Sequence, residues 1–491
     1  MTVVVAIDAG TTGVRSIAFS DTGKQLASAY REFPQYFPQP GWVEHDALEI
    51  WGAVVATLAD VSEAIDEPIV TIGITNQRET VVVWDTATGA PLHRAIVWQD
   101  RRTADRCTEL AEAGQLDLVR STTGLVLDPY FSGSKLEWLI RNKHITVTDT
   151  TAFGTVDSWL VWKLTGGKEH ITDTTNASRT LLFDIGQMEW STNMLEMFGI
   201  PRSVLPEVLP SSGRFGDTTD GLAIPAGIPI SGIAGDQQAA LFGQACFNPG
   251  DAKNTYGTGS FILMNVGANK PDPVEGLLTT VGWTLADGTT TYALEGAVFV
   301  TGAAIQWLRD GLNIIDEAAE IGPLAASVES SDDVFFVPAL TGLGSPWWDA
   351  HARGAIVGLT RGTTRAHLAR ATVESIALQS RDVIDAMSSA GGVNVESLRV
   401  DGGASIMELL LQIQADQIGV PVHRSAVAET TAQGAAYLAG IAEGVWSGPE
   451  EISAAWQSDL SVEPAADRTA ADALHSRWLQ AVDHSRNWAT P

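Results

Sequence analysis

The fold is decided by the first strand and the turn that follows it, residues 3–16, which read VVVAIDAGTTGVRS. An apolar, β-branched run that ends at the carboxylate of Asp8 predicts a buried strand, and the glycines after it predict a tight hairpin into a second strand. An altered copy, NTYGTGSF, occupies residues 254–261. Glycine lets backbone amides approach a phosphate, and threonine hydroxyls add donors. Two such turns predict one nucleotide held between two lobes, although either turn alone is compatible with an ordinary hairpin.

The two hairpins favour an actin-like architecture. The chain has no Gly-x-x-x-x-Gly-Lys-Ser/Thr motif, and no Gly-x-Gly-x-x-Gly follows a strand and opens a helix. We therefore expect an α/β fold with two actin-like (ribonuclease H-like) ATPase domains flanking a nucleotide cleft. The 491 residues exceed what one core needs. The turn Asn248-Pro249-Gly250 predicts a boundary between an N-terminal domain, residues 1–247, and a C-terminal domain, residues 248–491.

Composition narrows the possible partners. The formal charge of −29, from 59 acidic and 30 basic residues, argues against nucleic acid or an anionic membrane as a partner. No apolar run approaches the length of a membrane span, and the N-terminus lacks the pattern of a secretory signal. The cysteines, Cys107 and Cys246, have no metal-binding spacing, so we expect reduced thiols and a cytoplasmic location.

Strand and helix patterns alternate along the chain. Residues 47–65 predict a helix between early strands, and a second series of strands begins near Gly250. A long helix is expected from Thr364, as its N-cap, to Met387. The last fifty residues, rich in Ala, Asp and Glu, predict peripheral helices.

Asp236 is the candidate general base. It follows the apolar strand 228–234 and opens the helical segment GDQQAALFG, residues 235–243. A carboxylate at this point can be a plain N-cap. Alternatively, it takes a proton from an attacking hydroxyl while Gln237 fixes a neighbouring hydroxyl. Asp8, at its own strand end, is the corresponding candidate to hold a hydrated Mg²⁺ against phosphates.

Arg78 and Glu79 follow the strand 71–75 and form either a surface ion pair or a donor and acceptor fork for a small polyol. Trp98 and Tyr130 are candidate walls of the same site, although large aromatic residues more often belong to a core. Asp401-Gly402-Gly403 lies between a strand and a helix, where glycines let a flat nucleoside lie against the backbone; the same tripeptide is also a common turn.

The assembled motifs resemble the FGGY carbohydrate kinase family over roughly residues 3–446. Unrelated segments agree in order and spacing, among them residues 8–15, 73–80, 130–135, 235–243, 253–260 and 400–404. Within the family, residues 172–180 and the Arg78-Glu79 pair are similar to the branch that phosphorylates glycerol rather than xylulose or gluconate. The resemblance implies ATP and Mg²⁺ as cofactors, glycerol as substrate, phosphorylation to sn-glycerol 3-phosphate and a homodimer or homotetramer.

The resemblance also implies a role for each matching residue. It implies a polyol site made of Arg78, Glu79, Trp98, Tyr130, Asp236, Gln237 and Phe261. It implies nucleotide contacts from Thr11, Thr12, Gly13, Arg15, Thr258, Gly302, Gln306, Gly403 and Met407. Asp8 and Asp236 are the implied metal ligands, and Asp236 the implied catalytic base.

Two stretches depart from the family pattern. Residues 9–14, AGTTGV, replace the more usual Gln-Gly-Thr-Thr-Ser-Ser, and Met407-Glu408 replaces Asn-Asn. Two other readings stay open: a kinase for another polyol or ketose on the same fold, and, from a different class, a nucleotide-dependent interaction protein like actin or a chaperone. A polyol fork is needed by the kinases and not by the interaction protein.

Overall fold

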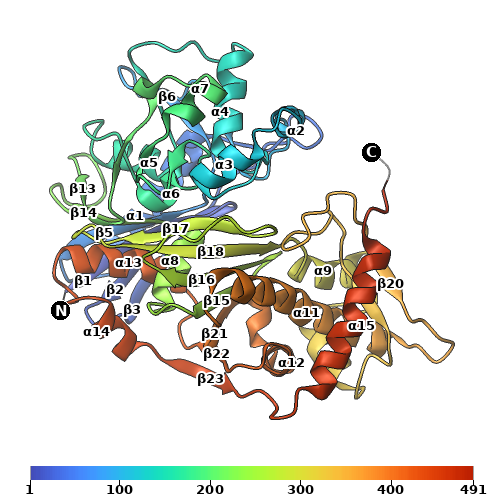
Figure 1. Ribbon diagram of the computed structural model, residues 1–491. Helices are drawn as coiled ribbons and strands as arrows, with labels where there is room; N and C mark the ends of the chain where they lie inside the picture. Colours follow the sequence, from blue (N-terminus) through green and yellow to red (C-terminus); the bar gives the residue numbers. More distant parts are fainter. Residues whose placement is uncertain (1, 490–491) are drawn as a thin grey trace.

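The computed structural model describes residues 2–489. Each of its two main sheets carries packed helices, and a further group of helices lies above the first sheet (Figure 1). The expected two-lobed α/β architecture is confirmed.

The first sheet contains the strand and hairpin of the N-terminal stretch. Its order is β13-β14-β5-β1-β2-β3. The strands are β1 (Val3–Ala9), β2 (Gly13–Ser20), β3 (Gln25–Glu32), β5 (Ile69–Asn76), β13 (Ser212–Asp217) and β14 (Pro229–Gly235). Neighbours β1 and β5, and β5 and β14, are parallel, whereas the remaining pairs are antiparallel.

The second sheet repeats this pairing pattern with one additional strand. Its order is β17-β18-β16-β15-β21-β22-β23. The strands are β15 (Asp251–Tyr256), β16 (Ser260–Gly267), β17 (Leu278–Thr284), β18 (Thr290–Val298), β21 (Ser397–Gly402), β22 (Val422–Ser425) and β23 (Ser458–Val462). Here β15 and β21, and β21 and β22, are the parallel pairs. The hairpin β15–β16 therefore holds the same place as β1–β2, as the repeated turn in the sequence predicts.

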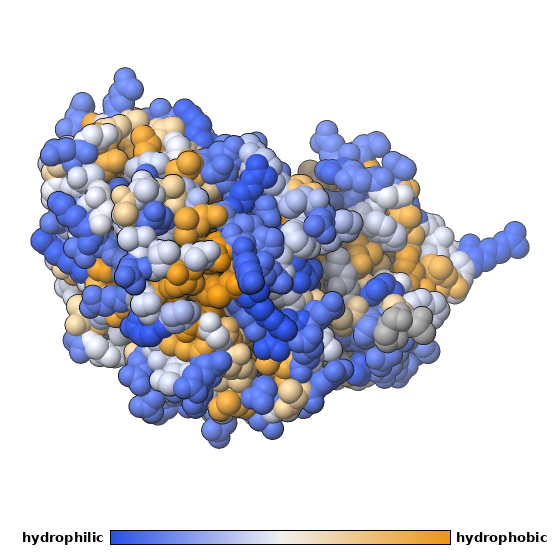
Figure 2. All heavy atoms as spheres, turned by 90° about the horizontal axis from the view of Figure 1, so that it is seen from above, coloured by the Kyte–Doolittle hydropathy of each residue, from blue (hydrophilic) through white to orange (hydrophobic). Residues whose placement is uncertain are grey.

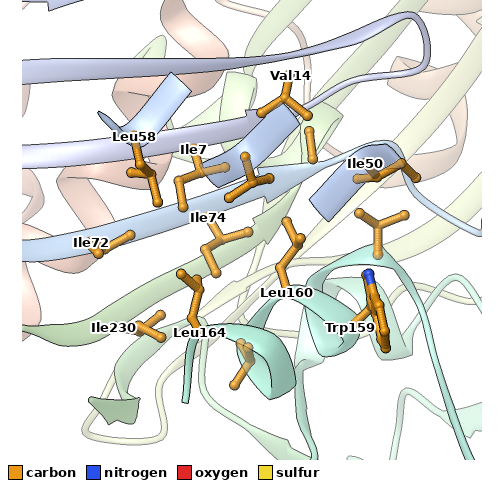
Figure 3. Packing of buried hydrophobic residues seen from close by; sticks show 14 of the residues in the cluster. Ile7, Val14, Ile50, Leu58, Ile72, Ile74, Trp159, Leu160, Leu164 and Ile230 are labelled. Carbon is orange, nitrogen blue, oxygen red and sulfur yellow. The ribbon is translucent and has the colours of Figure 1, made fainter. Parts of the chain in front are cut away.

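The first strand is buried on both faces, as its continuous apolar run indicates. Val3, Val5 and Ile7 pack with α1 (Ala47–Glu63) and α5 (Val156–Leu164), and Figure 3 shows Ile7 and Ile74 facing Leu58 and Leu160. On the other face, Val4 and Ala6 belong to a second cluster with α8 (Asp236–Gly243) and α13 (Thr430–Ala442).

Helix α13 belongs to the C-terminal half of the sequence but packs under the first sheet and against α8. Glycines permit this close approach. A Cβ on Gly73 of β5 would lie 3.1 Å from the backbone nitrogen of Ala436, and a Cβ on Gly434 would lie 2.9 Å from the backbone nitrogen of Gly243. The chain therefore crosses three times between the two sheets, because it returns to the second sheet at β23 after α13. Its division at residues 247 and 248 stays a prediction.

The helices above the first sheet form a separate cluster with short strands. The helices are α2 (Ala104–Glu112), α3 (Leu116–Thr123), α4 (Ser132–Arg141), α6 (Thr174–Ala177), α7 (Thr192–Phe198) and η1 (Arg202–Val204). The strands are β4 (Glu44–His45), β6 (Val82–Asp85), β7 (Ala95–Ile96), β8 (Thr151–Gly154), β9 (Ile171–Asp173), β10 (Phe183–Asp184), β11 (Glu189–Trp190) and β12 (Glu207–Leu209). Leu278 and Val281 of the second sheet join this cluster, which ties it to both lobes.

The second lobe contains the expected long helix. Thr364 is its N-cap, and α11 (Arg365–Gly391) extends one turn beyond the predicted end. The other elements are α9 (Gly302–Asp310), η2 (Ala318–Glu320), α10 (Ile321–Ala326), β19 (Phe335–Val337), β20 (Ala355–Val357), η3 (Gly403–Ile406), α12 (Glu408–Ile418), α14 (Pro449–Ala455) and α15 (Thr469–Ser485). The expectation of helices alone in the last fifty residues is wrong, because residues 458–462 form β23 at the edge of the second sheet.

Seen from above, the surface is largely hydrophilic; an extended group of hydrophobic residues lies left of the centre, and smaller groups are scattered elsewhere, including the right part (Figure 2). Within residues 2–489, no helix has both the length and the apolar composition that a membrane crossing requires. Cys107 and Cys246 are both buried free thiols.

Candidate active site

Three parallel strands of the first sheet end side by side. Ala9 at the end of β1 pairs with Asn76 of β5, and Asn76 pairs with Gly235 of β14. The segments that follow these ends are the Gly10–Gly13 turn, Arg78-Glu79 and Asp236, which are the sites that the sequence singled out. Their convergence is a direct result of parallel pairing, because the carboxyl ends of parallel strands lie at one edge of a sheet.

The turn between β1 and β2 is closed by a hydrogen bond from the Gly10 nitrogen to the Gly13 oxygen, 3.0 Å long. It carries the predicted phosphate contacts Thr11, Thr12, Gly13 and Arg15. Thr11 Oγ1 accepts a hydrogen bond of 3.0 Å from Trp98 Nε1, which brings a predicted polyol wall next to this turn. Arg15 pairs with Glu429 at the start of α13.

Asp8 lies directly before this turn, and its pKa is raised to about 7. Burial is the main cause, followed by the negative charges of Asp236 and Glu429, while Arg15 opposes them. A nearby cation stabilises the ionised form of such a buried carboxylate. Across residues 2–489, no three His, Cys, Asp or Glu side chains cluster closely enough to hold a metal by themselves. Mg²⁺ commonly uses one or two carboxylates together with phosphates and water, so Asp8 and Asp236 fit such an ion.

The predicted nucleoside residues line one cavity of about 630 Å³ in the second lobe. The cavity is bounded by Thr258 in the turn after β15, by Gly302 and Gln306 of α9, and by Gly403 and Met407 before α12. A Cβ on Gly302 would lie 2.6 Å from the Gly257 oxygen, so this helix start approaches the second turn closely. A Cβ on Gly403 would meet open space, which means that the cavity lies against bare backbone at this point.

Arg78 and Glu79 are almost completely buried, with side-chain exposures of 2% and 1%, and do not form a surface ion pair. Arg78 Nε lies 3.2 Å from Asp236 Oδ1, and Arg78 Nη2 donates to the Tyr130 hydroxyl at 3.2 Å. Glu79 has a φ of 61°, in the left-handed region that non-glycine residues seldom occupy. Backbone strain of this kind is concentrated at functional sites.

Asp236 is the first residue of α8, whose N-cap is Gly235, so Asp236 is not a plain N-cap. Its Oδ1 accepts a hydrogen bond of 2.7 Å from the Gln237 backbone nitrogen, and its side chain remains 34% exposed. The Gln237 side chain accepts a hydrogen bond from Lys253, a buried residue of β15. Burial lowers the pKa of Lys253 to about 8, although nearby carboxylates, including Asp236, oppose that shift.

Of the three aromatic residues predicted to line the polyol site, two pack against each other. Trp98 and Tyr130 are half-buried and pack edge to face, with ring centroids 5.5 Å apart. Phe261 lies on β16 opposite Ala297 and packs against the cluster that contains Leu263 and Trp283. Its contact with a polyol stays a prediction.

Sequence reasoning missed Arg179, Lys253 and Glu295 as parts of the site. Arg179 Nε donates to Glu79 Oε1 at 2.7 Å, and Arg78 Nη1 donates to Glu295 Oε2 at 2.6 Å. Glu295 interrupts the apolar strand residues Tyr292–Val298, and a lone carboxylate in a buried strand indicates a buried ion pair. That signal was present in the sequence, but it does not identify the partner.

Comparisons with known proteins agree with this architecture over the whole chain. The N-terminal domain model of the FGGY family of carbohydrate kinases matches residues 3–243, and the C-terminal domain model matches residues 252–443. A glycerol kinase of Bacillus cytotoxicus is 51% identical over 492 residues, covering 99% of both chains. A protein of Thermotoga maritima named glycerol kinase 2 is 51% identical over 495 residues, again covering 99% of both.

Among solved structures, Plasmodium falciparum glycerol kinase with ADP superposes with a TM-score of 0.94 at 35% identity, covering 99% of this chain and 98% of that one. Relatives of this identity and coverage, together with both domain models, establish the relationship. The chain belongs to the FGGY family of carbohydrate kinases.

Proposed function

We propose that this protein phosphorylates glycerol with ATP to give sn-glycerol 3-phosphate. The observation that carries the proposal is the meeting of three features at one edge of the first sheet: a glycine-threonine turn, the buried Arg78-Glu79 pair and the half-exposed carboxylate of Asp236. Relatives at 51% identity over the whole chain are named glycerol kinases, which supports the choice of glycerol.

Asp236 is the proposed general base. Both of its protein contacts use Oδ1, which leaves Oδ2 to accept the proton of a glycerol hydroxyl as that oxygen attacks the γ-phosphorus. Arg78 Nε, 3.2 Å from Oδ1, helps to hold the carboxylate in this orientation. Gln237, whose side chain is held by Lys253, is the proposed contact to a neighbouring hydroxyl.

The remaining polyol residues select the substrate. Glu79 Oε1 is occupied by Arg179, so Oε2 is the proposed acceptor for a glycerol hydroxyl, and Tyr130 and Trp98 limit the size of the molecule beside it. A small site of this kind excludes larger sugars by contact with the aromatic rings. Closure of the lobes over the substrate excludes water, which otherwise competes with glycerol for the phosphoryl group.

ATP is the proposed phosphoryl donor, bound with its phosphates between the two turns and its nucleoside in the cavity beside Gly403. The kinase family and the ADP in the Plasmodium falciparum structure support this choice. Mg²⁺ would be held by Asp8 and Asp236, and its charge would neutralise the phosphate oxygens. Arg15 and the backbone amides of the first turn orient the γ-phosphate for in-line attack.

A polyol panel with Mg-ATP tests the substrate. We expect glycerol to be phosphorylated with a higher kcat/KM than xylulose, gluconate or larger polyols; a higher value for any of these would assign the protein to another substrate. Stoichiometric phosphorylated product separates a kinase from an actin-like or chaperone-like ATPase, which releases only inorganic phosphate.

The Asp236→Asn variant tests the base. We expect kcat to fall by roughly 10²- to 10⁴-fold while the protein stays folded. Near-normal turnover in the folded variant would remove Asp236 from the chemical step. A homo-oligomeric state and a cytoplasmic location complete the proposal, the latter supported by the two buried free thiols.

A further inference from the structure

Arg78 and Glu79 are half of a set of four buried charges. The other half is Arg179, which follows α6, and Glu295 of β18. The side chains of Arg179 and Glu295 are fully inaccessible to solvent. We call these four residues the charge quartet.

Glu295 fixes the plane of the Arg78 guanidinium. Glu295 Oε2 accepts from Arg78 Nη1 at 2.6 Å, and Glu295 Oε1 accepts from Arg78 Nη2 at 3.1 Å. This two-point contact allows one orientation of the guanidinium fork. In that orientation Arg78 Nε faces Asp236 and Nη2 faces the Tyr130 hydroxyl.

Arg179 holds the Glu79 carboxylate through one hydrogen bond and is itself held by Glu295. Its Nε donates to Glu79 Oε1 at 2.7 Å, and its Nη2 donates to Glu295 Oε1 at 2.9 Å. The Glu79 backbone is held as well, because its carbonyl accepts from Ser132 Oγ at 2.9 Å. One oxygen of Glu79 is therefore bound inside the protein, and the direction of the other is determined.

The formal charges of the quartet sum to zero, with two arginines and two glutamates. Burial raises the pKa of Glu79, and the charges of Arg78 and Arg179 oppose that shift. Burial alone would raise the pKa of Glu295, but the charges of Arg179 and Arg78 lower it to about 2. Buried ion networks add little stability compared with apolar residues of similar size, so stability alone does not explain four charges at this position. Their place beside the partly exposed carboxylate of Asp236 points to a role in the site.

The quartet also joins the two halves of the fold. Arg78 and Glu79 follow β5 of the first sheet, whereas Glu295 lies within β18 of the second sheet. The orientation of the polyol fork in one lobe is thus set by a residue of the other lobe.

We infer that Arg179 and Glu295 are positioning residues of the polyol site, which hold Arg78 and Glu79 in the orientation that receives the hydroxyls without contacting the polyol themselves. The inference rests on the proposed function, since it assigns these residues to the site at which glycerol would bind.

Steady-state kinetics of the full-length protein test the inference. We expect Glu295→Gln to raise the KM for glycerol at least tenfold, while the KM for ATP changes less than threefold. The control is Asp382→Asn, which neutralises another buried carboxylate: Asp382 accepts from His475 Nε2 at 2.7 Å and Trp478 Nε1 at 2.8 Å where α15 packs on α11. We expect the control to lower the midpoint of thermal unfolding but to leave the KM values for glycerol and for ATP within twofold of the parent.

A double variant separates positioning from folding. Glu295→Gln leaves Arg179 with one fewer counter-charge, and adding Arg179→Met restores neutrality. We expect the double variant to regain at least half of the thermal midpoint lost by Glu295→Gln, while the glycerol KM stays at least tenfold raised.

Two results would overturn the inference: a glycerol KM within twofold of the parent in folded Glu295→Gln, or a double variant in which the glycerol KM recovers together with the midpoint. Failure of the parent protein to phosphorylate glycerol would instead refute the proposed function, so the two failures are distinguishable.

Discussion

Replacing Gly434 by alanine tests whether close packing of α13 against α8 sets the position of Asp236. An added Cβ would lie 2.7 Å from the carbonyl carbon of Ala239 and 2.9 Å from the nitrogen of Gly243, and nearer still to the Ala239 oxygen. These atoms are backbone atoms of α8 and cannot rotate away, so the two helices have to separate by roughly 1 Å. Asp236 begins α8 and moves with it.

The size of the effect follows from two opposing terms. Overpacking costs about 1–3 kcal/mol, and the better helix propensity of alanine offsets about 1 kcal/mol of it. We therefore expect the free energy of unfolding to fall by up to roughly 2 kcal/mol. A shift of this size at a reacting group lowers kcat by up to about 100-fold.

The matched control is Gly52→Ala in the middle of α1, where an added Cβ meets no atom within 4 Å. Here only the difference in helix propensity acts, so the free energy of unfolding should rise by about 0.5–1 kcal/mol while kcat stays unchanged. Urea unfolding and kcat at saturating substrates measure both variants. The reasoning is refuted if Gly434→Ala is as stable and as active as the parent, or if both variants lose stability equally.

Three further predictions concern the nucleotide and pH. Gly403→Val fills open space in the nucleoside cavity and should raise the KM for ATP at least tenfold with little change for glycerol; equal losses for both substrates would contradict this placement. Met407 offers no directional hydrogen bond to a base, so Met407→Asn should increase the preference for ATP over GTP in kcat/KM by about two- to tenfold, and an unchanged ratio would mean that this position does not read the base. Burial, and then the charge of Asp173, raise the pKa of Asp157 from 3.8 to about 7. Between these two pH values the folded state binds more protons than the unfolded state, so the free energy of unfolding falls as the pH rises from the lower value to the higher. Asp157→Asn removes this term, and its stability relative to the parent should be higher at pH 8 than at pH 5 in urea unfolding; a pH-independent difference would show that Asp157 does not titrate in this range.

Local signals in the sequence were sufficient for the two hairpins. The glycines at residues 10 and 13, and those at 257 and 259, occupy turns that join antiparallel strands, so a short-range pattern determines a short-range structure. Thr364 marked the start of α11 for the same reason. The segments that end at Ala9, Asn76 and Gly235 could be named as strands, and parallel pairing then brought their functional residues together.

Contacts between distant segments could not be derived in this way. Nothing near Arg78 indicates that its partner is Glu295, 217 residues later, because the pairing depends on how the two sheets meet. Residues 458–462 were missed as a strand because they lie at a sheet edge with alternating half-buried and exposed positions, which resemble those of a polar surface segment. The return of α13 to the first sheet depends on glycines in separate elements, among them Gly73 of β5 and Gly434 of α13 itself, and no local pattern connects them.

The two sheets repeat one pairing pattern but carry different residues beside the turns of the β1–β2 and β15–β16 hairpins. The second residue pair from the turn is Asp8 opposite Arg15 in the first copy, and Thr255 opposite Phe261 in the second. One copy presents a guanidinium group and a carboxyl group whose pKa is raised to about 7, whereas the other presents only a hydroxyl and an aromatic ring. The first copy is therefore the only one of the two that places a cation, Arg15, at this position, and there Arg15 pairs with Glu429. The asymmetry thus gives the cleft a direction, and a chain built from two identical copies would bind the same molecule equally well in either orientation.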